Sequence, residues 1–278
     1  MKVLLRKRAL IKISGRDAES FLQAQLSNDI SLLKQKMIQL NAYCQHQGKI
    51  LALFWVMRDH DSFLLSFPRD LLEKIQSRLK MFVIMSDVEI EDISDNSNQI
   101  GVINETYKEA YKLDNNLSLI IENSKSKSKS KSNDESLSDE WIKASIDSLL
   151  PEIFLTTSEK FVPQMLNLDI NEIGVNFSKG CYPGQEVVAR LHYLGSAKRR
   201  LFSFQSNHEM QVGDSLYCTT SKTALARGDR YKGSGIVVSK VKSSTLFFCL
   251  ATLDVDLIDE EITLNNENGL KLERINYE

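Results

Sequence analysis

The sequence lacks any apolar run long enough to cross a membrane, and its longest uninterrupted apolar stretch covers only residues 50–57. A spanning helix needs about 20 such residues, so no membrane span is expected. Charged residues stand near the N-terminus at Lys2, Arg6, Lys7 and Arg8, but no apolar stretch of signal-peptide length follows them. The sequence therefore predicts a cytoplasmic protein.

Cysteine is scarce, with four residues in a chain of 278: Cys44, Cys181, Cys218 and Cys249. They are widely separated and form neither a C-x-x-C pair nor the dense framework of a small secreted domain, so reduced thiols are expected. The lack of clustered Cys and His also argues against a stable four-ligand iron–sulfur site within one chain. Cys218 and Cys249 fall in strand-like segments and are interpreted as packing residues, and no spacing argument pairs Cys44 with Cys181.

Charge of one sign is not in excess, because the formal net charge is only -2. A chain with this balance has no global field that attracts nucleic acid. Any contact with RNA is therefore expected to be weak and to depend on a local patch or on a shared enzyme partner.

The first half of the chain shows strand and helix patterns in alternation. Apolar residues at helical spacing follow Asp17, and a second stripe, in which Pro68 suits the first turn, carries Leu72, Ile75 and Leu79 as far as Phe82. The segments with strand character are residues 9–13, 38–44, 50–57 and 62–67. This pattern is typical of an α+β fold.

Serine and lysine alternate strictly over residues 124–132, and acidic residues follow. Such a segment has no apolar face and repels itself, so we expect a disordered insertion over residues 124–138. It is either a plain surface loop or a basic tether that touches RNA. Ser138 is then expected to cap a helix that ends near Pro151.

The pattern changes after Ala197 to short strands separated by turn residues, which predicts a small antiparallel barrel. The expected strands are residues 201–204, 216–218, 235–238, 245–251, 262–264 and 270–272. At roughly 150 residues per domain, we place one α+β region at 1–197 and the barrel domain at 198–278.

The most specific local motif is the turn KGCYPGQE, residues 179–186, preceded by a strand-like segment from Phe177. Gly180, Pro183 and Gly184 permit a tight turn that presents the thiol of Cys181. Residues 185–190 are expected to form a helix or an extended shoulder.

A helix beginning near Gln185, together with the ammonium of Lys179, would favour thiolate over thiol at Cys181. Cys181 would then serve as a nucleophile, a redox sensor or an iron ligand. The alternative is a small buried apolar residue in a glycine-rich bend.

The run KGCYPGQEVVARLHYLGSAKRR, residues 179–200, resembles the signature of the YgfZ family. This family is similar to the glycine cleavage T-protein (GcvT) and to a mitochondrial iron–sulfur assembly factor. Residues 13–30, residues 161–168 and the pair Gly48-Lys49 also resemble the family. The resemblance implies interlocked α+β lobes around a central channel, followed by a C-terminal β-barrel.

The resemblance further implies a folate-binding accessory protein that maintains iron–sulfur enzymes, including those that modify tRNA. Cys181, with Lys179, is then the functional thiol, and Gly180, Pro183 and Gly184 shape its turn. The implied cofactor is tetrahydrofolate or another reduced folate. The implied partners are iron–sulfur client enzymes such as tRNA-modifying radical enzymes, and we expect a monomer.

Folate contacts are carried over to residues in and near the turn and to one distant tryptophan: Trp141, Tyr182, Gln185, Glu186 and Arg190. Trp141 is either a pterin contact or a core residue, because it shares an apolar stripe with its helical neighbours. Glu186 either holds a pterin edge or caps the turn. The second pocket tryptophan of the family aligns near Arg8, where this sequence has no aromatic residue.

A cationic group close to the domain boundary comprises Arg190, Lys198, Arg199 and Arg200. These side chains either receive a polyglutamate tail or an RNA phosphate, since both are anionic, or form a solvated rim.

The T-protein is organised around an aspartate that lies in the strand after its central glycine turn. The matching position here is Leu51 or Ala52, and the next acid is Asp59. We therefore expect no autonomous aminomethyltransferase activity. The alternatives to an accessory role are a folate-dependent one-carbon transferase or demethylase of unknown substrate, and a direct tRNA-binding module.

Overall fold

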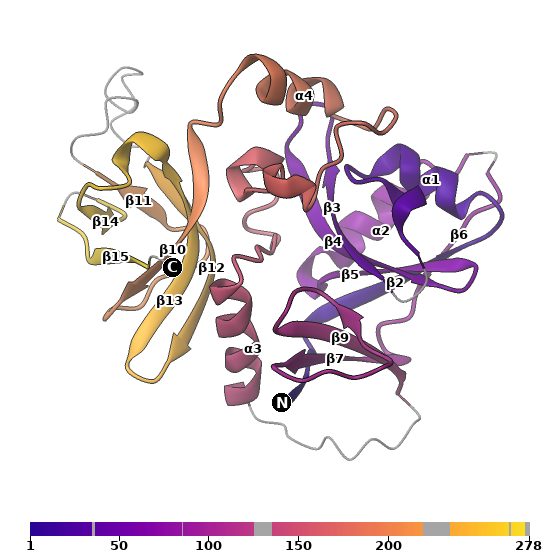
Figure 1. Cartoon of the computed structure of the whole chain (residues 1–278), viewed down its shortest axis with the longest axis horizontal. Helices are drawn as coiled ribbons and strands as arrows, with labels where there is room; N and C mark the ends of the chain where they lie inside the picture. Colours follow the sequence, from indigo (N-terminus) through magenta and orange to yellow (C-terminus); the bar gives the residue numbers. More distant parts are fainter. Residues whose placement is uncertain (35–36, 85, 125–134, 219–233, 267, 276–278) are drawn as a thin grey trace.

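The computed structural model describes residues 1–34, 37–84, 86–124, 135–218, 234–266 and 268–275, and it shows two antiparallel sheets with helices beside a C-terminal barrel (Figure 1). The α+β class and the antiparallel barrel are confirmed. No helix among the residues described in these ranges is long and apolar enough to span a membrane.

The larger sheet has five strands in the order β3-β4-β5-β2-β6, and every neighbouring pair is antiparallel. Its longest strand, β4, is an interior strand that forms because its β-branched and aromatic residues are buried along almost its whole length. Helices α1 and α2 add their apolar side chains to the same core as this sheet. The bounds are β2 Arg8–Ser14, β3 Ile38–Cys44, β4 Ile50–Asp59, β5 Ser62–Pro68, β6 Glu89–Asp92, α1 Ala18–Gln25, η1 Ile30–Leu32, η2 Arg69–Leu71 and α2 Leu72–Lys80.

A second, four-stranded sheet has the order β1-β7-β9-β8. Its strands are β1 Lys2–Leu4, β7 Ser97–Ile103, β8 Tyr111–Lys112 and β9 Leu117–Asn123. Apolar side chains leave both faces of the β7–β9 pair, since Leu119 belongs to one core cluster and Ile120 to another. The sheet therefore contributes to two separate apolar clusters.

Helix α3, Glu135–Asp147, contacts strands of the barrel on one side and strands β1 and β7 on the other (Figure 1). The expectation that Ser138 caps this helix is wrong, because the helix begins three residues earlier and Leu137 already packs against the core. The disordered insertion was expected to extend to residue 138, which is too far, because residues 135–138 belong to α3. Residues 125–134 lie outside the described part of the chain. The helix also ends before Pro151, because Leu149 adopts a left-handed φ of 52°.

Six strands close the C-terminal barrel in the order β10-β13-β12-β11-β14-β15. Their bounds are β10 Arg199–Ser206, β11 Ser215–Tyr217, β12 Gly235–Ser243, β13 Leu246–Asp254, β14 Ile262–Leu264 and β15 Lys271–Ile275, and η5 Val255–Leu257 follows β13. The core of the barrel contains Phe204, Leu216 and Cys249. Closure removes exposed strand edges, which explains how strands as short as β11 and β14 are stable.

The segment between α3 and the barrel consists of η3 Pro163–Leu166, η4 Ile170–Glu172 and α4 Gln185–Leu194. The predicted strand-like segment at Phe177 is wrong, because the backbone there is irregular and the ring of Phe177 stacks on His192 of α4 instead. Residues 185–190 are helical, which settles the open choice between a helix and an extended shoulder. Figure 1 shows α4 at the top of the seam between the larger sheet and the barrel.

Candidate functional site

Lys179 anchors the start of the KGCYPGQE turn to the end of α1. Its Nζ donates hydrogen bonds to the backbone oxygens of Gln23 at 2.7 Å, Leu26 at 2.5 Å and Asn28 at 3.0 Å. Burial lowers the pKa of Lys179 to about 8, and Asp29 partly opposes this effect. Since its three hydrogen bonds go to backbone carbonyls, this side chain anchors the turn, and the predicted effect of its charge on the thiol of Cys181 stays a prediction.

Gly184 fixes the other end of the turn, where α4 begins. It has a φ of 83°, and a Cβ at this position would lie 2.5 Å from the backbone oxygen of Gln45. Gly48, in the tight turn that connects β3 and β4, lies directly against it. Only glycine allows this conformation and this close approach, so α4 is held against the β3–β4 turn. A Cβ at Gly180, by contrast, would meet no other atom within 4 Å.

Cys181 is exposed, whereas Lys179 and Tyr182 on either side of it are each only 7% exposed. Burial raises the pKa of Tyr182, and the neighbouring thiol of Cys44 raises it further. Cys44 itself is fully buried, and burial raises its pKa to about 12. The turn therefore presents one thiol to solvent and keeps the other inert, which excludes the alternative of a buried Cys181.

The first turns of α4 carry the predicted polar contacts close to this thiol. Gln185 is half-buried and its Nε2 lies 3.5 Å from the backbone oxygen of Lys179, whereas Glu186 and Arg190 are exposed. Glu186 lies in the first turn, where the helix dipole favours an acidic side chain. Gln185 thus lies beside the backbone of the turn, and the contacts of Gln185, Glu186 and Arg190 with a pterin stay predictions.

An aromatic group at the other end of α4 was not predicted from the sequence. The rings of Phe177 and His192 are stacked with centroids 3.7 Å apart, and Tyr193, which is 66% exposed, meets both rings edge-on. The sequence feature that could have predicted this group is the adjacent pair His192-Tyr193, which departs from the apolar stripe of the helix. These rings add an aromatic surface near the turn.

Trp141 lies apart from the turn, in the core between α3 and the sheets. Its ring packs edge-on against Trp55 with centroids 6.0 Å apart, and it fills the space that a Cβ on Gly101 would need. Trp55 lies five residues along β4 from Ile50, a rise of roughly 16 Å from the β3–β4 turn. At 4% exposure Trp141 has the surroundings of a core residue, and its folate contact stays a prediction.

Arg8 occupies the position where the family places a second tryptophan. Its guanidinium lies 3.9 Å from the ring centre of Trp55, donates to Ser66 Oγ and pairs with Glu152. Burial lowers the pKa of Arg8 to about 9. A buried arginine that stacks on Trp55 and pairs with Glu152 therefore lies in this region.

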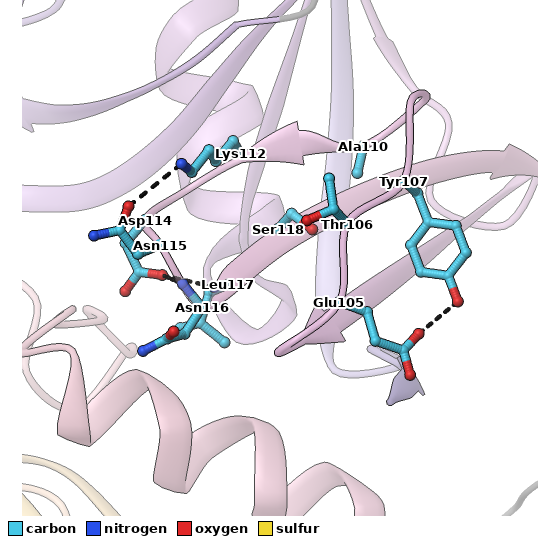
Figure 2. A pocket seen from close by; sticks show the side chains of 10 residues that line it. All are labelled: Glu105, Thr106, Tyr107, Ala110, Lys112, Asp114, Asn115, Asn116, Leu117 and Ser118. Carbon is cyan, nitrogen blue, oxygen red and sulfur yellow. Dashed lines mark hydrogen bonds between the residues drawn. The ribbon is translucent and has the colours of Figure 1, made fainter.

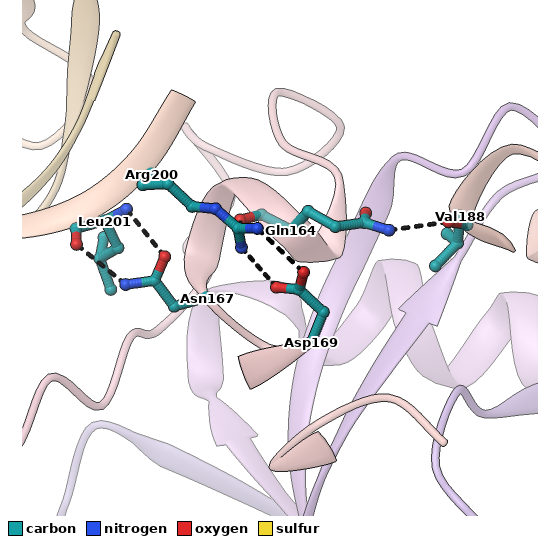
Figure 3. Close-up of polar contacts among 6 residues, drawn as sticks. All are labelled: Gln164, Asn167, Asp169, Val188, Arg200 and Leu201. Carbon is teal, nitrogen blue, oxygen red and sulfur yellow. Dashed lines mark hydrogen bonds and ion pairs between the residues drawn. The ribbon is translucent and has the colours of Figure 1, made fainter. Parts of the chain in front are cut away.

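Two of the predicted cations are used in structural ion pairs at the barrel junction (Figure 3). Arg200 binds both carboxylate oxygens of Asp169, at 2.5 and 3.1 Å, and donates to the backbone oxygen of Gln164. Gln164 Nε2 in turn donates to the backbone oxygen of Val188 in α4 at 2.7 Å. Arg199 pairs with Asp254 at 2.7 Å. Arg199 and Arg200 therefore both form ion pairs, and the interpretation as a solvated rim does not hold for these two residues.

A pocket of about 400 Å³ lies at the junction of the barrel, α4 and the β3–β4 turn. Its lining residues are Lys49, Lys160, Phe161, Met165, Leu191, Ser196, Ala197, Lys198, Arg199, Ile236, Thr252 and Asp254. Lys198 and Arg199 are predicted cations that line this pocket, and Lys49 and Lys160 join them from segments distant in the sequence. Burial, and then the charge of Arg199, lower the pKa of Lys49.

A smaller pocket of about 110 Å³ lies beside β8 and β9 (Figure 2). Its polar groups are used within its own loops: Glu105 accepts from the hydroxyl of Tyr107 at 2.5 Å, and Asp114 accepts from two backbone N–H groups of the following turn. Lys112 donates to Asn115 at 3.3 Å. These bonds hold the loops, and we assign no chemistry to this pocket.

Two further features limit the chemistry. The positions that match the catalytic aspartate, Leu51 and Ala52, are buried at 2% and 0% exposure within β4. Within the described ranges, no three His, Cys, Asp or Glu side chains converge as a metal site.

The fold has a close counterpart among solved structures. The crystal structure of glycine cleavage system aminomethyltransferase T from Bartonella henselae superposes with a TM-score of 0.67, covering 99% of this chain and 84% of that one, at 11% sequence identity. This likeness defines a protein of the T-protein fold class.

Relatives in sequence narrow the class further, although no family model matches the chain. An uncharacterised protein of Haemophilus influenzae is 30% identical over 274 residues, which cover 96% of this chain and 93% of that protein. Proteins named tRNA-modifying protein YgfZ are 25% identical in Photorhabdus laumondii, over 93% of this chain and 82% of theirs, and 28% identical in Aliivibrio fischeri, over 91% and 84%. The chain belongs to the YgfZ family, whose fold is related to that of the T-protein.

Proposed function

We propose that this chain is a folate-binding accessory protein that maintains iron–sulfur enzymes, including those that modify tRNA, through the thiol of Cys181. It works in the cytoplasm as a monomer, takes tetrahydrofolate or another reduced folate, and meets client enzymes such as tRNA-modifying radical enzymes. The role in tRNA modification rests on the name that its relatives carry. The folate and iron–sulfur roles rest on the resemblance of the KGCYPGQE turn.

The observation that carries the proposal is the exposure of Cys181 between two anchored residues, Lys179 and Gly184. Lys179 holds the turn to α1, and Gly184 holds it to the β3–β4 turn. A thiol that served only as packing would be buried, as Cys44 and Cys249 are. An exposed thiol on an anchored turn is suited to react with a small molecule or with a metal centre of another protein.

The residues near the thiol supply groups that a reduced folate requires. A pterin needs an aromatic surface and amide or carboxylate partners for its ring edge. Gln185 and Glu186, at the start of α4, supply the second, and the rings of His192 and Tyr193 lie about two turns further along the helix, roughly 10 Å away. When bound, the folate would supply a reduced pterin beside the thiol, and the two together would protect, repair or hand on an iron–sulfur cluster of a client enzyme.

Two measurements test the proposal. Calorimetry on the purified protein should detect binding of tetrahydrofolate, and a deletion strain expressing Cys181→Ala should show reduced methylthiolation of tRNA. Cys218→Ala, which removes a thiol in the barrel, is the matched control and should complement like wild type. The proposal fails if tetrahydrofolate does not bind and if Cys181→Ala restores methylthiolation fully.

A folate-dependent transferase would behave differently in a third measurement. Steady turnover of labelled one-carbon units into folate by the purified protein would favour catalysis, and stoichiometric consumption would favour the accessory role. The buried apolar side chains of Leu51 and Ala52 offer no general base for such turnover. We therefore propose the accessory role alone.

A further inference from the structure

The aromatic group at the C-terminal end of α4 forms an exposed surface of its own. The ring of His192 lies on that of Phe177 with an interplanar angle of 17°, and Tyr193 meets the two rings edge-on at 4.8 and 6.1 Å. Tyr193 is 66% exposed, and the next residue, Leu194, is 84% exposed. Exposed apolar side chains that gather in one patch mark a contact surface more often than single ones do.

This surface is held in place by the body of the molecule. Phe177 is half-buried and packs against the largest apolar core cluster, so it gives His192 a fixed support. The chain beside Phe177 is fixed by hydrogen bonds, from Asn176 N–H to the backbone oxygen of Ser27 at 3.0 Å and from Ser178 N–H to Asn176 Oδ1 at 2.9 Å. A partner that binds here therefore loses little free energy to ordering the rings.

The chain around these rings is cationic, although the whole protein is not. Residues 187–208 include four Lys or Arg and no acidic residue, whereas the formal net charge of the protein is -2. Two of these cations, Arg199 and Arg200, are used in the ion pairs of the barrel junction. The other two, Arg190 and Lys198, are exposed and pair with no carboxylate among the residues that the structure describes. They are therefore available to an anion.

Arg190 and the exposed rings share one side of α4. Tyr193 and Leu194 follow Arg190 by three and four residues, the spacing that brings side chains together on a helix surface. The opposite side is turned inward, since Val188 is buried and Leu191 lines the junction pocket. A cation and an exposed ring therefore lie next to each other, about one helical turn apart.

The end of α4 also presents hydrogen-bond acceptors. Among the described residues, neither the C-cap residue Gly195 nor Ser196 donates a backbone hydrogen bond to the last turn. The last carbonyls of a helix have no partner inside it. These oxygens, which include those of Tyr193 and Leu194, can therefore accept from N–H groups of a ligand that stacks on the ring.

These features together fit the unpaired nucleotides of an RNA. A base offers a flat face to Tyr193 and N–H donors to the carbonyls at the helix end, and its phosphate is an anion for Arg190. A protein partner would need a larger surface, since an interface takes about 20–30 residues from each side. Of its large apolar side chains, α4, which is described throughout, exposes only Tyr193 and Leu194.

We propose that the C-terminal half of α4 is an RNA-binding surface, on which Tyr193 stacks with an unpaired base and Arg190 and Lys198 hold the adjoining phosphates. The inference rests on the proposed function in one respect: RNA is favoured over DNA because the clients include enzymes that modify tRNA. Figure 1 shows α4 at the upper edge of the molecule, and the helix begins four residues after Cys181. A bound RNA would thus lie along the helix that follows the thiol-bearing turn.

The test is fluorescence anisotropy of the full chain, without folate, with a labelled RNA stem-loop and with the fully paired duplex of the same stem. We expect the stem-loop to bind at least about tenfold more tightly, because only its loop offers a base for stacking. Tyr193→Ala should weaken binding of the stem-loop by about tenfold, and Tyr193→Phe should retain it. Phe82→Ala, at an exposed ring after α2, is the matched control and should bind like wild type.

The dependence on salt tests the phosphate contact separately. Arg190→Gln should weaken binding and reduce the slope of log Kd against log salt concentration by about 0.7, because one contact to a single strand is lost. Lys80→Gln, at an exposed position of α2, is the matched control and should leave the slope unchanged.

Three outcomes overturn the inference: no binding of the stem-loop at moderate salt, equal affinity for stem-loop and duplex, or unchanged affinity in Tyr193→Ala. If Tyr193→Ala binds RNA like wild type but loses affinity for an iron–sulfur client enzyme, the surface belongs to a protein partner and the inference is also overturned. Calorimetry with tetrahydrofolate and complementation by Cys181→Ala do not depend on these results, so the proposed function is tested independently.

Discussion

Replacing Lys179 by Met tests whether this side chain anchors the turn, because the substitution keeps the apolar stem and removes the ammonium. A hydrogen bond from a charged group contributes about 1.5–3 kcal/mol net, so three of them contribute about 4.5 kcal/mol at the low end. Burial opposes them: the pKa falls from 10.5 to about 8, and a tenfold change in proton affinity is about 1.4 kcal/mol, which gives a cost of about 3.5 kcal/mol. We expect Lys179→Met to lower the free energy of unfolding by about 1 kcal/mol at neutral pH.

The same substitution has a pH dependence of defined sign. Since the folded pKa of Lys179 is about 8 and the usual value is 10.5, the unfolded chain binds more protons between these two values. The wild type therefore gains stability from this group as pH rises through that window, and the Met variant does not. The deficit of the variant should widen between about pH 8 and about pH 10.

Urea denaturation under reducing conditions measures both effects. Trp55 and Trp141 are buried at 2% and 4% exposure, so their fluorescence reports unfolding. Lys80→Met, at an exposed position, is the matched control and should leave the midpoint unchanged. A deficit that narrows as pH rises would refute the reasoning, because it would mean that the folded pKa of Lys179 lies above its usual value of 10.5.

Three further predictions concern the same part of the molecule. Gly184→Ala should lower the free energy of unfolding by about 1–3 kcal/mol in thermal melts, because its Cβ would meet the β3–β4 turn, whereas Gly180→Ala should lie within about 0.5 kcal/mol of wild type; equal melts for the two variants would contradict the role of the left-handed residue. A thiol reagent added to the native protein should modify Cys181 fastest, and this phase should vanish in Cys181→Ala, while Cys44, whose pKa burial raises to about 12, should react only after unfolding. Arg200→Lys should cost about 1–2 kcal/mol in denaturation, because an ammonium cannot reproduce the two parallel bonds to the carboxylate; an unchanged midpoint would show that these bonds add nothing.

The sequence predicted the barrel and the larger sheet because their strands carry local signals. Turn residues separate the barrel strands, and the residues of β4 are apolar without interruption from Ile50 to Met57. The four-stranded sheet escaped prediction because the β7–β9 pair has apolar residues on both faces, so no alternation marks it. Ile120 and Leu119, adjacent in the chain, pack in different clusters. Such a strand differs from a short buried helix only in its long-range partners.

The sequence predicted only those features of the site that depend on residues close together in the chain. Glycine and proline around Cys181 predicted an exposed thiol, and the structure shows one. The partners of Lys179 could not be predicted, because the carbonyl of Leu26 is 153 residues away in the sequence. For the same reason Lys49 and Lys160 had no visible relation to Lys198 until the barrel was packed against α4. The fold thus uses Arg199 and Arg200 in ion pairs and brings to the pocket two lysines that the pattern did not mark.

The bonds made by η3 and the residue that follows it have a mechanical consequence. Gln164 donates to α4 through Val188 O and accepts from the barrel through Arg200, and Asn167 exchanges two bonds with Leu201 of β10. The segment formed by η3 and Asn167 is therefore hydrogen-bonded both to α4, the helix that follows Cys181, and to β10, the first strand of the barrel. A tilt of the barrel would therefore act through these bonds on α4, the helix that begins four residues after Cys181.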